Sequence, residues 1–69
     1  MAGDEAKGYR GAASLVGLAW RELERDHPEA AKEGDKTPFG AALVRLRRLE
    51  RALMDAARDA EWREASSSN

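Results

Sequence analysis

The chain lacks cysteine, contains only two prolines and has four aromatic residues among its 69 positions. Without cysteine it can form no disulfide, iron–sulfur site or thiolate nucleophile, and a zinc site built on thiolates is excluded as well. The formal net charge is only -1 at pH 7, so no long-range field draws nucleic acid or an anionic membrane toward it. Any such binding must come from a local patch.

Long apolar runs are also absent, since no stretch approaches the ~20 residues that a membrane span requires. Met1 to Lys7 lacks the basic, apolar and small-residue succession of a secretion signal. We therefore expect a cytoplasmic protein that does not enter a membrane.

What is present is helix-forming. Charged residues make up 36% of the chain and hydrophobic residues 42%, which predicts an all-α protein rather than a disordered one. A chain this short buries a small fraction of its surface, and it has no disulfide to stabilise it. We therefore expect the chain to be stabilised by association with further copies of itself.

The longest helical pattern runs from Thr37 to Ala65. Thr37 is a good N-cap and Pro38 suits the first helical position, where its missing N–H costs nothing. About 28 residues at ~1.5 Å each make a rod of roughly 42 Å. Apolar residues recur along it at alternating steps of three and four, which is coiled-coil spacing. They are Phe39, Ala42, Leu46, Leu49, Leu53, Ala56 and Ala60.

A first helix is predicted from Tyr9 to Arg25, ending before His27-Pro28 because a residue that precedes proline is disfavoured in a helix. Residues 28–33 should form a short helical turn that stops at Gly34. We thus expect a flexible arm over residues 1–8, an antiparallel two-helix hairpin over 9–65 and a disordered tail over 66–69.

Each helix carries more apolar surface than one partner helix can cover. On the first helix a stripe of Tyr9, Ala12, Val16, Ala19 and Leu23 is widened by three larger residues. We predict that the hairpin dimerises into a four-helix bundle. The oligomer seam would be formed by Phe39, Leu46, Leu49 and Leu53 of the second helix and by Leu15, Leu18 and Trp20 of the first.

Pairing the helices outward from the loop places Trp20 near Leu43, and Tyr9 near Met54. By this count the end of the second helix extends past the first, so that Trp62 lies beyond intrachain cover. A tryptophan on a charged helix face is a common interface anchor. We predict that Trp62 contacts another chain, with packing on the N-terminal arm or simple exposure as the alternative.

Four arginines lie within two turns of the second helix, namely Arg45, Arg47, Arg48 and Arg51. Such a cluster could follow phosphates. Glu50 interrupts it, however, and no aromatic residue is interleaved for base stacking. Paired or solvated surface charge, an acidic protein partner and nucleic acid all remain compatible with this cluster.

Catalytic and metal-binding constellations are weak. Glu24 and His27 have the E-x-x-H spacing of di-iron bundles, but they stand at the frayed end of a helix in a chain with a single histidine. Neither Ser14 nor the serines of the tail is expected to have a general base close enough to activate it as a nucleophile. We expect no catalytic residue, no metal and no cofactor.

These features favour a small non-catalytic protein–protein interaction module that acts as a helical homo-oligomer. An adaptor, an accessory subunit of a larger enzyme and a phage-encoded inhibitor fit them equally. Its partners would be a second copy of itself and a second protein, bound through Trp62 and the four arginines. The alternative is a small dimeric nucleic-acid-binding regulator that uses the arginine face of the second helix.

Overall fold

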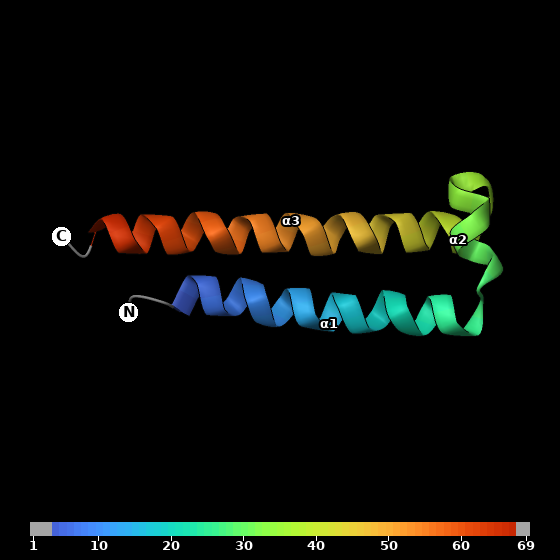
Figure 1. Cartoon of the computed structure of the whole chain (residues 1–69), viewed down its shortest axis with the longest axis horizontal. Coiled ribbons are helices and arrows are strands. Elements are labelled where there is room, and N and C mark those ends of the chain that lie inside the picture. The colour runs from blue at the N-terminus through green and yellow to red at the C-terminus, as the bar shows by residue number, and fades with distance from the viewer. Residues whose placement is uncertain (1–3, 68–69) are drawn as a thin grey trace.

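The computed structural model describes residues 4–67, and within that range all regular structure is helical. Two long helices, α1 (Asp4–Asp26) and α3 (Pro38–Ser67), lie side by side and antiparallel (Figure 1). A short helix α2 (Glu29–Glu33) and a 3-10 turn η1 (Gly34–Lys36) join them at one end of the rod. The predicted all-α antiparallel hairpin with a helical turn in its connection is confirmed.

The first helix begins at Asp4, five residues earlier than the sequence predicted. Ala6 is buried, and the Glu5 carboxylate pairs with Arg63 of α3 across 3.1 Å. These contacts outweigh the helix-propensity cost of about 1 kcal/mol for a glycine such as Gly8. Residues 4–8 of the predicted arm are therefore helical, and residues 1–3 lie outside the described residues.

The connection between the long helices follows local signals in the sequence. α1 ends one residue before His27, and Pro28 takes helical angles as the N-cap of α2. Gly34 ends α2 with a φ of 61° and donates its N–H to the carbonyl of Ala30. Only glycine adopts a backbone with such a positive φ without steric cost, which explains why a glycine ends the helix at this position.

The start of α3 is capped as predicted. Thr37 has an extended backbone, and its Oγ1 accepts a hydrogen bond of 3.1 Å from the N–H of Gly40. At its other end α3 continues two residues past the predicted Ala65, and residues 68–69 of the predicted tail lie outside the described residues.

Small residues form the core of the hairpin. Among the described residues the buried hydrophobic side chains are Leu43 and five alanines, namely Ala6, Ala13, Ala30, Ala57 and Ala60. Gly17 and Gly40 are buried with them. Because alanine and glycine bury little apolar area, this core contributes less hydrophobic stabilisation than one built from leucine and phenylalanine.

The register of the two long helices differs from the prediction. Trp20 lies beside Glu50, seven residues or about two helical turns along α3 from the predicted neighbour Leu43. The reason is the folded connection: α2 and η1 pack on the first turns of α3, where a Cβ on Gly40 would overlap the carbonyl oxygen of Gly34. The start of α3 is thus covered by the connection, and α1 packs further along.

The hairpin forms a single layer. Its extents are 49 × 17 × 12 Å, and the smallest is about the diameter of one helix. Stable domains are usually built from at least two packed layers. Both flat sides of this hairpin are therefore open.

Candidate interaction surface

One flat side of the hairpin is apolar on both helices. On α3 the coiled-coil spacing places four half-exposed or exposed residues on one flank: Leu46, Leu49, Leu53 and Ala56. On α1 a stripe at the same spacing is half-exposed: Tyr9, Ala12, Val16 and Leu23. Together we call these eight residues the apolar face.

A polar pair shows that the two stripes lie on the same side. Glu5 precedes Tyr9 by four residues and so continues the stripe of α1, while Arg63 follows Ala56 by seven and continues that of α3. Arg63 Nη2 donates to Glu5 Oε1 across 3.1 Å. Because both side chains extend their stripes and meet, both stripes face the same way.

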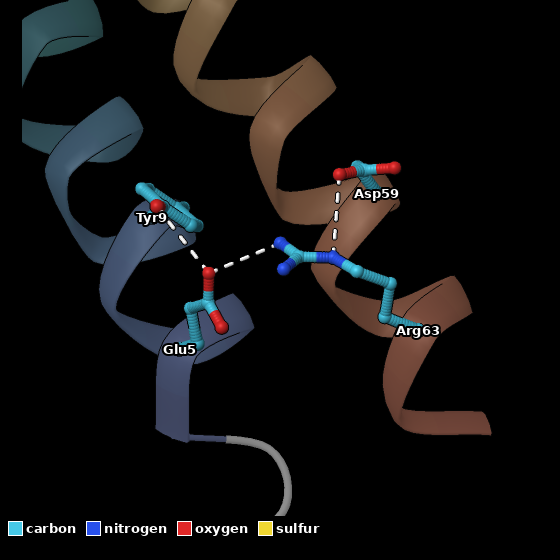
Figure 2. Close-up of polar contacts among 4 residues, drawn as sticks. All are labelled: Glu5, Tyr9, Asp59 and Arg63. Carbon is cyan, nitrogen blue, oxygen red and sulfur yellow. Dashed lines mark hydrogen bonds and ion pairs between the residues drawn. The ribbon is translucent and has the colours of Figure 1, made fainter. Parts of the chain in front are cut away.

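This pair belongs to a polar cluster that bounds one end of the apolar face. The hydroxyl of Tyr9 donates to Glu5 Oε1 across 3.4 Å, and Arg63 Nε lies 3.3 Å from Asp59 Oδ2. Figure 2 shows the Glu5 carboxylate between the Tyr9 hydroxyl and the Arg63 guanidinium, with Asp59 on the far side of the arginine. The cluster holds the N-terminal turns of α1 against α3.

Stacked rings lie at the opposite end of the hairpin. His27 stacks on Phe39 with ring centroids 4.1 Å apart and an interplanar angle of 25°. The imidazole Nδ1 also lies 3.6 Å from a carboxylate oxygen of Glu29. His27 thus contacts Phe39 and Glu29, and the predicted seam residue Phe39 remains 48% exposed beside it.

Trp20 does not lie on the uncovered seam that the sequence predicted. Its indole N–H donates to Glu50 Oε1 across 2.8 Å, and the guanidinium carbons of Arg21 and Arg47 lie 5.1 and 5.2 Å from its ring centroid. The side chain is half-buried between the helices. The shifted register brings Glu50 to it, and this contact occupies Trp20 within its own chain.

Leu15 and Leu18 also depart from the predicted seam. Leu15 is 69% exposed and Leu18 is 59% exposed. At ~100° per residue both lie roughly opposite the buried residues Ala13 and Gly17, on the back of α1. They therefore do not share a face with Leu46, Leu49 and Leu53, and the predicted seam divides into two separate surfaces.

The four arginines spread around α3. Arg47 lies over the ring of Trp20, toward α1. Arg48 and Arg51 are exposed on the outer side, and Arg45 is exposed at the edge of the apolar face. Of these four, Arg48 and Arg51 form the exposed pair on the side of α3 away from the apolar face.

Trp62 is the most exposed large apolar residue of the described chain, at 70%. Its neighbours Glu61 and Arg63 pair with Arg10 and Glu5 of α1. At ~100° per residue Trp62 is turned away from both of these neighbours, onto the outer side of α3. The end of α3 extends past the start of α1, as predicted (Figure 1).

The pair between Arg10 and Glu61 joins the helices on the side opposite the apolar face. Arg10 Nε donates to Glu61 Oε2 across 3.0 Å. The hydrogen bond from Arg10 lowers the pKa of Glu61, and the same bond raises the pKa of Arg10. Both side chains are about half exposed, so solvent screening keeps the contribution of this pair to stability small.

Residues 4–67 contain no preformed binding site for a small molecule or a metal ion. That range contains no pocket and no group of three acidic or histidine side chains arranged to hold a metal ion. In the same range no helix has the length and apolarity needed to cross a membrane.

Sequence reasoning missed the structural role of Glu50 and the cluster around Glu5. Both depend on contacts between residues at least 30 positions apart. The apolar stripe of α1 was readable from its spacing, although nothing in the pattern showed that it lies beside Leu46, Leu49 and Leu53.

Comparisons with known proteins give no match: no family model, curated protein or solved structure is similar to the chain. The fold defines the chain as a small helical hairpin with one apolar side.

Proposed function

We propose that this chain is a small, non-catalytic protein–protein interaction module that acts as a helical homodimer. The apolar face would join two hairpins into a four-helix bundle, and the outer side of α3 would bind a second protein. Adaptor, accessory-subunit and inhibitor roles all use such a surface.

The observation that supports this proposal is the apolar face itself. After the hairpin has folded, Leu49 remains 47% exposed, and Leu46 and Leu53 are only half-buried. Fully burying a leucine side chain is worth about 1.5–3 kcal/mol. With a core of alanines around one leucine, a single hairpin has marginal stability. Covering the apolar face would therefore supply a large part of the stability of the folded protein.

The surface for a second protein centres on Trp62. Tryptophan and arginine are enriched among the residues that dominate binding energy at interfaces. Trp62 stands exposed on the outer side of α3, and Arg48 and Arg51 are exposed on that side closer to the loop. A partner with an apolar pocket and a neighbouring acidic patch suits this surface.

Sedimentation equilibrium at low micromolar concentration tests the self-association. We expect twice the 7.6 kDa mass of one chain. Leu49→Gln, on the apolar face, should shift the mass toward one chain. The matched control is Leu15→Gln on the back of α1, which should leave the dimer intact. A cooperatively folded species of single-chain mass for the unmodified protein would contradict the proposal.

The alternative function is a small nucleic-acid-binding regulator, and the observation that favours it is the exposure of Arg48 and Arg51. Arg48→Glu combined with Arg51→Glu should then abolish a salt-sensitive mobility shift of duplex or single-stranded nucleic acid. Arg47 is unsuitable for this test because it also packs on Trp20. Absence of any shift by the unmodified protein at low salt would exclude this alternative.

A further inference from the structure

We propose that the two copies pack through their apolar faces about a single two-fold axis perpendicular to the helices. In this arrangement α3 packs antiparallel on α3 of the second copy, α1 packs on α1, and the loops lie at opposite ends of the bundle. The inference rests on the self-association proposed above and adds its orientation and register.

The apolar positions of α3 are arranged symmetrically about Arg51. Leu49 and Leu53 lie two residues on either side of it, Leu46 and Ala56 lie five, and Ala42 and Ala60 lie nine. In an antiparallel pair of helices, residues equidistant from the centre meet across the interface. Leucine would thus meet leucine at the middle, leucine would meet alanine in the next layers, and alanine would meet alanine at the ends.

The stripe of α1 has its own centre at Val16. Tyr9 and Leu23 lie seven residues on either side of it. An antiparallel α1 pair centred there would bring Val16 onto Val16 of the second copy. It would also bring Tyr9 onto Leu23 of that copy.

The two centres stand at the same level of the hairpin. Gly17 and Glu50 are direct neighbours, since a Cβ on Gly17 would lie 2.5 Å from Glu50 Oε2. These residues adjoin Val16 and Arg51, the two centres. One axis therefore serves both helices, which is what an isologous interface requires.

Charges at the edge of the face are complementary under the same operation. Arg45, Ala52 and Asp59 follow one another at steps of seven along the edge of α3. Arg45 lies six residues before Arg51 and Asp59 eight after it, so antiparallel packing brings Arg45 to within about 3 Å, along the bundle, of the level of Asp59 of the second copy, twice per dimer. Among the described residues Arg45 has no ion pair, and Asp59 has one oxygen 3.3 Å from Arg63.

The ends of the face match as well. Glu5 and His27 lie eleven residues on either side of Val16, and Arg63 and Phe39 lie twelve on either side of Arg51. The Glu5–Arg63 pair of one copy would therefore face the stacked His27 and Phe39 of the other. A guanidinium over an aromatic ring and a carboxylate near an imidazole are both favourable contacts.

A charge exchange tests the edge pairs. Arg45→Asp and Asp59→Arg should each weaken the dimer about tenfold, because each creates two like-charge pairs. An equimolar mixture of the two variants should restore dimerisation, since opposite charges then meet in the heterodimer. Arg58→Asp is the control for net charge and should leave the dimer unchanged. Failure of the mixture to recover would overturn the proposed register.

Single cysteines test the axis directly, because the chain has no cysteine of its own. Ala52→Cys lies next to the axis and should be joined to its copy by a short bis-maleimide. Ser66→Cys occupies the same edge two heptads away, and antiparallel packing places it roughly 42 Å from its copy along the bundle. We expect covalent dimers from Ala52→Cys alone.

Each other outcome contradicts the inference in a distinct way. Cross-linking at both positions would mean parallel α3 helices. Cross-linking at neither, in a protein that sediments as a dimer, would overturn the register while the proposed function stands. A single-chain mass for the unmodified protein would overturn both.

Discussion

The indole N–H of Trp20 is hydrogen-bonded to Glu50 across 2.8 Å, and this contact joins α1 to α3 at that level of the hairpin. Glu50→Ala should lower the free energy of unfolding by about 1–3 kcal/mol, because it leaves a half-buried donor without its charged acceptor. Glu50→Gln keeps an acceptor and should cost less. Urea denaturation at one fixed protein concentration measures both, and equal losses would show that acceptor chemistry is unimportant here.

Glycine replacements should have opposite effects at two helical positions. Gly40→Ala should destabilise the fold by roughly 1–3 kcal/mol, because the new Cβ meets backbone at Gly34. Gly11→Ala should stabilise it by about 0.5–1 kcal/mol, because that position is open and alanine is the better helix former. Thermal melts followed by circular dichroism compare the two. Stabilisation by Gly40→Ala would contradict the close approach of α2 to α3.

The Arg10–Glu61 pair predicts a dependence of stability on pH. Hydrogen bonding from Arg10 lowers the pKa of Glu61 below its ordinary value of 4.5 in the folded state. Its contribution is therefore present above about pH 4.5 and is lost as the pH falls through the lowered pKa. Glu61→Gln should reduce the loss of stability between about pH 5 and pH 3, as measured by denaturation midpoints.

Arg10→Gln provides the control for this pH effect. It should reduce the acid-induced loss by the same amount, and the double variant should show no further change because the two groups act as one pair. Additive effects of the two substitutions would show that Glu61 and Arg10 act separately.

Fluorescence should distinguish the two tryptophans. Trp62 is 70% exposed, whereas Trp20 is half-buried between Arg21 and Arg47. Trp62→Phe should therefore leave emission that is blue-shifted and poorly quenched by acrylamide. Trp20→Phe should leave emission that is red-shifted and readily quenched. Protection of Trp62 in the isolated protein would mean that a further copy of the chain covers the outer side of α3.

Local chemistry made the helix ends readable from the sequence. The Thr37 cap, the break at His27-Pro28 and the stop at Gly34 each depend on one side chain and the backbone next to it. The register was not readable, because it depends on how closely α2 approaches Gly40.

The candidate site, like the fold, could be predicted from the sequence only in part. The spacing of Leu46, Leu49 and Leu53 correctly placed them on one side of α3. Trp62 is exposed, but Glu61 and Arg63 beside it both pair with α1, so its exposure reflects the face it occupies rather than the predicted overhang. Trp20 was assigned to the seam because a periodic pattern gives no sign of a partner thirty residues away.

The outward position of Trp62 near the end of α3 has a consequence for stoichiometry. In the antiparallel dimer the two indoles would stand near opposite ends of the bundle, roughly 33 Å apart along its length. Such a molecule would tether two target molecules at once rather than merely mask one. A target that is itself a symmetric pair with matching spacing would be held with an avidity well above that of either single contact.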